Sequence, residues 1–258
     1  MAAPQSNSIM TPAAHATCAS MPPHAREQVA AYRIVRDLRW AAMEGGQPAT
    51  PEGLLGAAGI NCTVSDADLD AIPKSGSLLI AVEGAFGILE GLVLAAVLPK
   101  ARADVKILAN YVLAEVPGFE SVFIAVDPWQ GKRAVPVNRQ AMAKAVKWLE
   151  GQGLLVVFPA GDGMAPRARH RPSPLWGTTP VRLARISGAP IVPVSLTGVG
   201  APGAPNTEVE VRIGLPILWE RLAAIGPEET ATEYVRWRAA ALRRRHQRSA
   251  RLVPRLSG

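Results

Sequence analysis

The stretch LLIAVEGAFGILEGLVLAAVL, residues 78–98, joins an apolar run, a glycine-containing turn and a second apolar run with helical spacing. Its first part, Leu78 to Val82, predicts a buried strand, and its last part, Ile88 to Leu98, predicts a helix. Backbone N–H groups and a helix N-terminus converge in a turn of this kind, which is where α/β proteins place their chemistry. Glu83 and Glu90 are the only charged residues of the stretch, and burying an unpaired carboxylate is costly. The stretch therefore predicts both a fold class and a candidate site.

The same pattern of strand and helix recurs along the middle of the chain. Further apolar runs that predict buried strands are Val105–Leu108, Val122–Val126, Leu154–Phe158 and Ile191–Leu196. Helical patterns lie between several of them, at residues 139–150, with Asn138 as the expected N-cap, and at residues 180–187. This alternation predicts an α/β fold with a mostly parallel central sheet flanked by helices. Residues 208–213 alternate with a period of two and predict an edge or half-exposed strand.

Composition divides the chain of 258 residues into four parts. Residues 1–24 are rich in Pro, Ser and Ala without periodicity, which predicts a disordered N-terminus. Residues 25–64 predict a helical N-terminal extension that ends in a short strand at 60–64. Residues 65–218 predict the α/β core, and residues 219–258 predict a basic C-terminal helical segment. A chain of this length, 48% hydrophobic, can form one large domain or two small ones with a sizeable core.

The charge of the chain favours anionic partners. A formal net charge of +7 favours phosphorylated ligands, lipid head groups or nucleic acid. Aromatic residues make up only 5% of the chain, which argues against single-stranded nucleic acid, because such sites use stacking side chains. Cys18 and Cys62 predict neither a disulfide framework nor a metal site, which favours a reducing compartment. The N-terminus lacks the pattern of a signal peptide, and two glutamates argue against a transmembrane helix in residues 78–98.

The C-terminal segment, residues 228–251, has helical spacing and is strongly basic. Its arginines are Arg236, Arg238, Arg243, Arg244, Arg245, Arg248 and Arg251. Tyr234, Trp237 and Leu242 give the helix one apolar side. Three interpretations stay open. They are a solvated helix packed by its apolar side, a helix on an anionic membrane surface, where each basic residue adds roughly 1 kcal/mol, and a helix that binds nucleic acid.

Two further motifs follow predicted strands. The sequence Phe158-Pro159-Ala160-Gly161-Asp162-Gly163 comes directly after a buried strand, and successive N–H groups around its glycines can form an anion-binding nest. Pro193 lies inside the predicted strand 191–196, which indicates a sheet edge or a break in the hydrogen-bond ladder. Taken alone, each motif is also typical of an ordinary strand end.

Five segments, taken in order, carry a resemblance to a known family. They are IPKSGSLLIAVEGAFGILEG, DVKILANYVL, FESVFIAVDPW, NRQAMAKAVKWLEGQGLLVVFPAGD and GAPIVPVSLTG. They resemble the glycerophospholipid (lysophospholipid) acyltransferase superfamily, in particular its bacterial hemolysin-like and lyso-ornithine-lipid branch. Residues 158–162 resemble the family's FPEG-type substrate motif, and residues 192–194 resemble its late VPV motif.

This resemblance implies an O-acyltransferase with a glycerolipid-acyltransferase-like fold. The implied reaction moves a fatty acyl group from acyl-CoA or acyl carrier protein to the hydroxyl of a lysophospholipid or lyso-ornithine lipid. These donors are co-substrates, so no bound cofactor and no metal are expected. The resemblance also implies a cytoplasmic protein that lies peripherally on the anionic inner face of the membrane.

The chain departs from the family at the first motif. The resemblance places Gly84 where the family has its general-base histidine, Glu83 where it has asparagine, and Ala85 where it has proline. Glu90 keeps the acid that orients the imidazole in the family. A glycine accepts no proton, and loss of a general base typically lowers the rate by about 10²- to 10⁴-fold. The alternatives to an active enzyme are a non-catalytic lipid-binding pseudo-acyltransferase and, in another class, a basic nucleic-acid-binding protein.

Two side chains are candidates to replace the missing base. Glu83 adjoins the vacant position, and a desolvated carboxylate can have a pKa near neutral. His170, beyond the FPAGDG motif, is the second candidate, although neighbouring arginines would lower its pKa. The candidate substrate-binding residues are Phe86, Gly87, Asn138, Arg139, Phe158, Pro159, Ala160, Gly161, Asp162, Gly163 and Pro193. Arg167, Arg169 and Arg171 are either further anion partners or a solvated basic loop.

Overall fold

A computed structural model of the chain describes residues 33, 35–37, 40, 44, 50–83, 88–114, 116, 118–127, 134–159, 176–198 and 207–252, with side chains to residue 243 in the last helix.

Within these residues, seven strands form one sheet in the order β1-β7-β6-β2-β5-β3-β4. The strands are β1 Ile60–Val64, β2 Leu78–Glu83, β3 Val105–Asn110, β4 Phe123–Val126, β5 Leu154–Val157, β6 Ile191–Thr197 and β7 Thr207–Ile213. Strands β2 to β6 all run in one direction, whereas β7 is antiparallel to β6, and β1 is parallel to β7. The predicted α/β fold with a mostly parallel central sheet is therefore confirmed.

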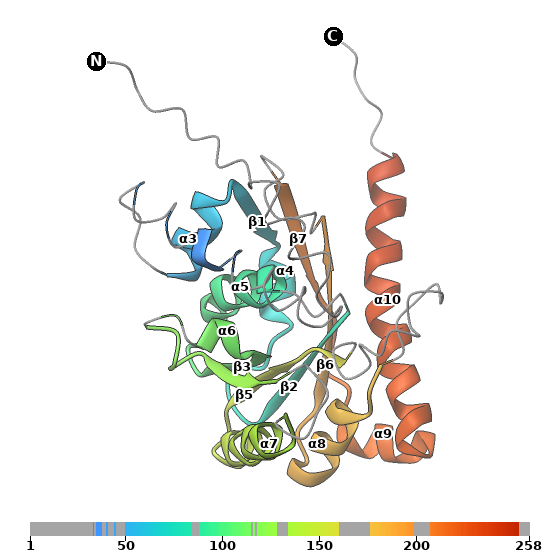
Figure 1. Cartoon of the computed structure of the whole chain (residues 1–258). Helices are drawn as coiled ribbons and strands as arrows, with labels where there is room; N and C mark the ends of the chain where they lie inside the picture. The colour runs from blue at the N-terminus through green and yellow to red at the C-terminus, as the bar shows by residue number, and fades with distance from the viewer. Residues whose placement is uncertain are drawn as a thin grey trace, which may run out of the picture.

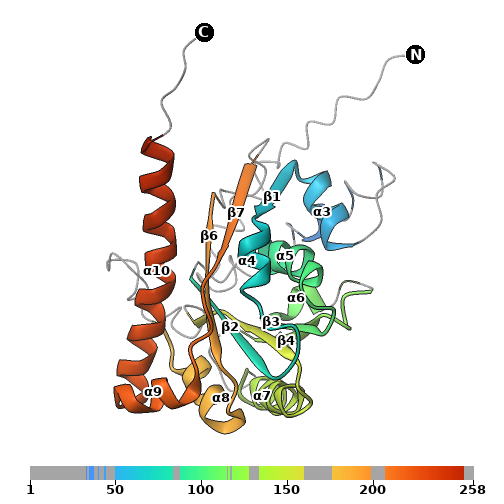
Figure 2. The ribbon, with the colours of Figure 1, turned by 180° about the vertical axis from the view of Figure 1, so that it is seen from behind.

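Helices cover both faces of the sheet (Figures 1 and 2). One face packs against α3 Pro51–Ala57, α5 Ile88–Val97, the 3-10 helix η1 Leu98–Lys100 and α6 Tyr111–Ala114. The other packs against α7 Ala134–Glu150, α8 Thr179–Ser187, α9 Trp219–Ile225 and α10 Glu228–Leu252. A short helix, α4 Asp66–Asp70, follows β1. We call these two sides of the sheet the α5 face and the α10 face.

The central strand β2 shows how the sequence builds this arrangement. It lies between β5 and β6 and is an unbroken apolar run up to Val82, as expected for a parallel strand covered on both faces. Its alternate residues divide between two hydrophobic cores. Ile80 and Val82 pack on the α5 face, and Leu79 and Ala81 pack on the α10 face. The same alternation places Glu83, the last residue of β2, on the α10 face.

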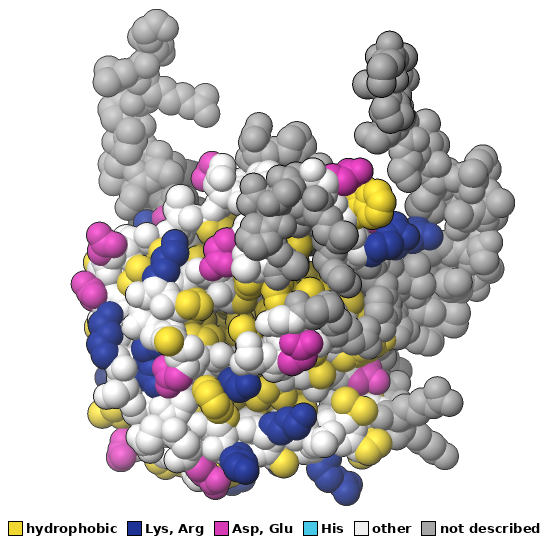
Figure 3. Space-filling view, turned by 90° about the vertical axis from the view of Figure 1, so that its left-hand side faces the viewer, with side chains coloured by type: hydrophobic (Ala, Val, Ile, Leu, Met, Phe, Trp, Pro, Cys, Tyr) yellow, Lys and Arg dark blue, Asp and Glu magenta, His cyan; other side chains and the backbone are white. Residues whose placement is uncertain are grey.

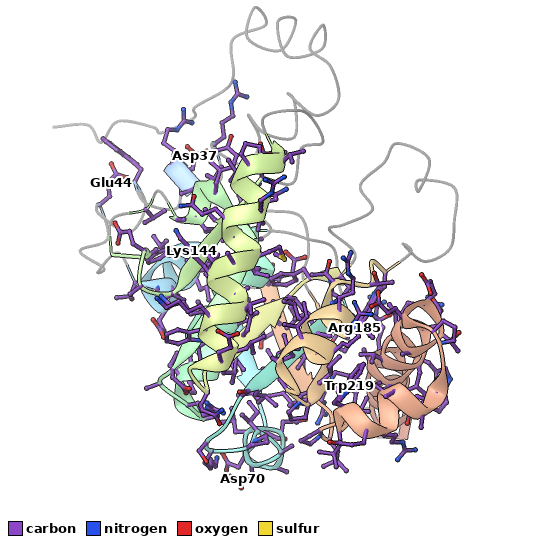
Figure 4. All side chains as sticks on the ribbon, turned by 90° about the horizontal axis from the view of Figure 1, so that it is seen from below. Asp37, Glu44, Asp70, Lys144, Arg185 and Trp219 are labelled. Atoms are coloured by element: carbon purple, nitrogen blue, oxygen red, sulfur yellow. The ribbon has the colours of Figure 1, made fainter. Side chains whose placement is uncertain are left out.

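Helices α8, α9 and α10 are joined at the amino edge of the parallel strands (Figure 4). Arg185 reaches from α8 to the first residue of α10, where its Nη1 lies 3.0 Å from Oε1 of Glu228. Helix α8 ends at Gly188, whose φ of 69° is a left-handed conformation that glycine adopts without strain. The predicted helix at 180–187 is thus confirmed to within one residue.

Helix α7 begins earlier than the sequence predicted. It starts at Ala134, so Asn138 lies inside the helix and its prediction as an N-cap is wrong. Pro136 fits in the first turn because the N–H that proline lacks has no intrahelical partner there. The side chain of Asn138 instead binds the end of β4: it accepts a hydrogen bond from Asp127 N and donates one to Asp127 O, both at 2.8 Å.

The antiparallel side of the sheet is formed by β7 and β1. Strand β7 is half-exposed, one of the two predicted alternatives, and lies between β6 and β1. The edge strand is β1, residues 60–64, so the predicted boundary at residue 64 separates a strand from its own sheet. Helix α10 also packs on β6 and β2, which joins the C-terminal segment to the core.

Candidate functional site

The candidate site is built at the carboxyl ends of three neighbouring parallel strands, β6, β2 and β5. Helix α5 follows β2 after residues 84–87, and residues 160–175 follow the end of β5. Connections at this edge of a parallel sheet are the usual place for ligands in α/β folds. The predicted strand–turn–helix motif and the FPAGDG motif therefore leave adjacent strands at the same edge of the sheet.

Glu90 lies in the first turn of α5 and is 7% exposed. All ten residues of α5 are buried, and its apolar residues belong to the core of the α5 face. Burial raises the pKa of the Glu90 carboxyl, and its own backbone N–H lowers it by a smaller amount. The structure thus contains a desolvated carboxyl group at the start of the helix that follows β2.

Phe158 lies on the same face as Glu90. It follows β5, is 5% exposed, and packs in the core of the α5 face. The next residue, Pro159, anchors the segment that contains the FPAGDG glycines, because its carbonyl oxygen accepts a hydrogen bond from Gly177 N at 2.9 Å. Residues 160–175 therefore leave and rejoin the described fold at the carboxyl end of β5.

Glu83 and Pro193 lie on the opposite face. Glu83 is paired in the β2–β6 ladder with Ser195, and Ala81 is paired with Pro193. Residues paired in adjacent strands project to the same side of the sheet, so Glu83, Ser195 and Pro193 share the α10 face. The sheet therefore separates the Glu83 side chain from Glu90, and the role of Glu83 as a substitute base stays a prediction.

Pro193 lies at a break in the ladder, as its position in a strand indicated. The β6–β7 pairing runs from Val194 to Thr197, and beyond it Gly214 N donates to the Pro193 carbonyl oxygen at 2.8 Å. A Cβ on Gly214 would lie 2.8 Å from Cγ of Pro193, so a larger residue would not fit there without a shift. This packing gives Pro193 a structural role on the α10 face.

Asn138 and Arg139 belong to α7, which covers the α10 face near β4. The hydrogen bonds of Asn138 go to the backbone of Asp127, while the Arg139 side chain is exposed. Neither residue lies on the face that carries Glu90 and Phe158. Their predicted role in substrate binding stays a prediction.

Several predicted site residues lie outside the described part of the chain. They are Gly84, Phe86, Gly87, Ala160, Gly161, Asp162, Gly163, Arg167, Arg169, His170 and Arg171. The residues that flank them, Glu83, Ile88, Pro159 and Trp176, fix where these segments begin and end.

Two buried polar residues at this edge were missed from the sequence. Ser195 is 1% exposed, and its Oγ has no hydrogen-bond partner within the described residues. Asn110, at the end of β3, is 8% exposed, and its Oδ1 accepts a hydrogen bond from Val112 N at 3.2 Å at the start of α6. A polar residue that ends an apolar strand is a signal for Asn110. Ser195 lies inside β6, and its pairing with Glu83 is visible only in the folded sheet.

The surface over α3, α5 and α6 carries hydrophobic side chains towards its middle, with charged side chains of both signs around them (Figure 3). Among the described residues, no cluster of His, Cys, Asp or Glu is suited to hold a metal ion. In the same part of the chain, no helix combines the length and the apolar character needed to cross a membrane.

Comparison with known proteins places the fold. No family model and no curated protein sequence matches the chain. A solved structure is similar: the 1-acyl-sn-glycerophosphate (LPA) acyltransferase PlsC from Thermotoga maritima, with a TM-score of 0.53 and 17% sequence identity. The match covers 81% of this chain and 79% of that one. This chain therefore shares the fold of a lysophosphatidate acyltransferase over most of its length.

Proposed function

We propose that this chain is an O-acyltransferase. It moves a fatty acyl group from acyl-CoA or acyl carrier protein to the hydroxyl of a lysophospholipid or lyso-ornithine lipid. The observation that carries this proposal is the fold shared with a lysophosphatidate acyltransferase over four-fifths of the chain. The order of the sequence segments that resemble the acyltransferase superfamily supports it independently, because the same segments form β2–α5, β3, β4, α7–β5 and β6.

The proposed reaction needs a group that accepts one proton. The acceptor hydroxyl attacks the thioester carbonyl, the C–S bond breaks, and the thiol leaves. Gly84 offers no side chain for the proton, so the carboxylates of Glu90 and Glu83 are the candidate acceptors. Glu90 has the environment that suits a base, because burial raises its pKa from the ordinary carboxyl range towards neutral pH.

The segment after β5 supplies the groups for an anionic substrate. Glycine-rich sequences such as Ala160-Gly161-Asp162-Gly163 favour backbone N–H groups that bind a phosphate or carboxylate. Gly87 and Phe86, in the turn before α5, are placed in sequence to line the same edge. Arg139 and the arginines of residues 167–171 are further candidates for the head group.

A second candidate function is a lipid-binding protein without turnover. The specific observation that favours it is Gly84, which removes the side chain that serves as base in the family that the sequence resembles. The two candidates share the substrate and the site, and they differ only in whether the proton is accepted.

The test measures acyl transfer from oleoyl-CoA to a panel of acceptors: lysophosphatidate, lysophosphatidylglycerol and lyso-ornithine lipid. The full chain is compared with Gly84→His and with the matched control Gly56→His, in an exposed position of α3 with open space around it. Acceptor-dependent transfer by the unmodified chain is expected, with a gain of about 10²-fold for Gly84→His. Transfer by Gly84→His alone would support the second candidate, and no transfer by any variant would contradict the proposed activity.

We also propose that the second half of α10 meets an anionic membrane surface from the cytoplasmic side. Among the side chains of α10 that the structure describes, the last buried one is Ala239, and Arg243 and Trp237 are exposed, Trp237 by 57%. Exposed tryptophan and arginine side chains suit the interface between lipid head groups and water. Acyl carrier protein, which would present an anionic surface to the same helix, is the alternative partner.

A further inference from the structure

The inference concerns the proton acceptor of the reaction and rests on the proposed acyltransferase function. Among the described residues, Glu90 is the only acidic side chain in the buried class. It makes no side-chain hydrogen bond or ion pair with any other residue of the described part. A buried carboxylate that no cation of the described residues compensates is unfavourable for folding, so its presence calls for a function.

The position of Glu90 suits a reacting group. It lies in the first turn of the helix that follows the central strand β2, at the carboxyl edge of the parallel strands. The next residue, Gly91, packs closely against α6, since a Cβ there would lie 3.0 Å from Cδ1 of Leu113. This close contact holds the first turn of α5 against α6, so the Glu90 side chain is presented from a fixed helix.

Glu83, the other acid of this motif, does not share that position. Its side chain leaves β2 on the α10 face, in register with Ser195, whereas Glu90 and Phe158 lie on the α5 face. On the α5 face, Glu90 is therefore the carboxylate closest in sequence to the glycine-containing segment 84–87.

We propose that Glu90 is itself the general base of the reaction. Its carboxylate takes the proton from the acceptor hydroxyl as that oxygen attacks the thioester carbonyl carbon. The C–S bond breaks, and the neutral carboxyl group then returns the proton to the departing thiolate. The balance needs no oxidant and no further reactant, and Glu90 ends the cycle ionised as it began.

Burial is the main cause of the raised pKa of Glu90, and the charged groups around it do not change this. The elements that pack against α5 are α3, β1, β3 and η1, and further neighbours are α6 and β4. Their titratable groups are Glu52, Cys62, Lys106, Lys100 and Tyr111. None of them contributes to the pKa of Glu90, which burial raises and its own N–H lowers. The pH profile of the reaction should therefore report a single carboxyl group with a raised pKa.

The experiment compares the full chain with Glu90→Gln, Glu90→Asp and the control Glu150→Gln, at the exposed end of α7. Transfer from oleoyl-CoA to the best acceptor of the panel is measured across pH. Glu90→Gln should lower kcat by about 10²-fold or more and abolish the fall of kcat at low pH. Glu90→Asp should keep part of the rate and still show the fall of kcat at low pH. Circular dichroism checks that each variant folds.

The outcomes separate this inference from the proposed function. Glu90→Gln with an unchanged kcat would overturn the role of Glu90 and leave the acyltransferase standing. Turnover by Gly84→His without turnover by the unmodified chain would also overturn it, because this chain would then contain no working base. Absence of transfer in every variant would overturn the proposed function, and the inference with it.

Discussion

The two glutamates of the central motif show how one residue's position in a strand decides its chemistry. Glu83 and Glu90 are seven residues apart in the sequence and both border the same turn. Strand alternation sends Glu83 to the α10 face, and the helix carries Glu90 on the α5 face. The alternation of Leu79, Ala81 and Glu83 was readable from the sequence. Which of the two faces would receive α5 was not, because that depends on the packing of distant helices.

At the residue scale, burial of Glu90 makes the stability of the fold depend on pH. Because the folded pKa is raised, the stabilisation is complete below the ordinary carboxyl pKa and is lost as pH rises through the folded pKa. In Glu90→Gln the side chain cannot ionise, so stability no longer falls as pH rises. At neutral pH the variant should be more stable than the unmodified chain by about 1–2 kcal/mol.

Urea unfolding between about pH 4 and pH 8 checks this prediction. The free energy of unfolding of the unmodified chain should fall relative to that of Glu90→Gln as pH rises. Parallel curves would show that Glu90 titrates normally.

Gly198 gives a second prediction at this scale. Its φ of 87° is left-handed, and a Cβ there would lie 2.0 Å from the carbonyl oxygen of Glu208. Gly198→Ala should therefore lower the free energy of unfolding by about 2–4 kcal/mol. The control Gly56→Ala, in α3 with open space around it, should raise that energy by up to about 1 kcal/mol. Equal effects in thermal or urea unfolding would show that the turn after β6 is not constrained as described.

At the scale of elements, the sequence predicted strands better than helix ends. Apolar runs marked β2, β3, β4, β5 and β6 because central parallel strands are buried on both faces. The start of α7 was missed because Val135, Pro136 and Val137 have no helical period, and two of these side chains are exposed hydrophobics. The role of Asn138 depends on a contact with Asp127 in another element, which no local pattern reveals.

Arg102 joins three connections at the amino edge of the sheet. It is 5% exposed, donates hydrogen bonds to the carbonyl oxygens of Pro73, Gly76 and Gln152, and pairs with Asp104. The same pair lowers the pKa of Asp104, so its contribution is present above the ordinary carboxyl pKa and is lost as pH falls.

Arg102→Met should cost about 2–4 kcal/mol in urea unfolding, because three carbonyl groups around the buried guanidinium lose their donor. Arg182→Met is the matched control. Arg182 is 62% exposed and lies 3.8 Å from Glu228, so its loss should change stability by less than about 1 kcal/mol. A similar cost for both substitutions would contradict the structural role of Arg102.

At the scale of the whole molecule, no feature of the sequence predicted that β1 and β7 run opposite to the other strands. β1 and β7 extend the parallel sheet in the opposite direction, and β1 comes from the part of the chain that was assigned to a helical extension. Both strands alternate in polarity, so they were recognisable as strands, but β1 pairs with β7 across about 150 residues of the chain. The site was predictable as a motif at a strand end, whereas its division between two sheet faces was not.

A prediction about membrane binding also belongs to the scale of the whole molecule. Replacing Arg243, Arg244 and Arg245 by Gln should weaken binding to vesicles that contain phosphatidylglycerol by about 10²-fold, at roughly 1 kcal/mol for each arginine. The control replaces three exposed lysines, Lys74, Lys144 and Lys147, by Gln. This removes the same amount of positive charge from other parts of the surface. Flotation with the vesicles measures both. Equal losses would show that net charge, and not α10, drives binding, and salt-sensitive binding to nucleic acid alone would support the nucleic-acid interpretation instead.

The central claim is that this fold transfers an acyl group with a carboxylate in place of the absent imidazole. Release of free CoA from oleoyl-CoA, measured with and without lysophosphatidate or lyso-ornithine lipid, tests it most directly when the full chain and Glu90→Gln are run side by side. We expect release that depends on the acceptor and falls by about 10²-fold in the variant. Release that is independent of the acceptor, or the same in both proteins, would contradict the claim.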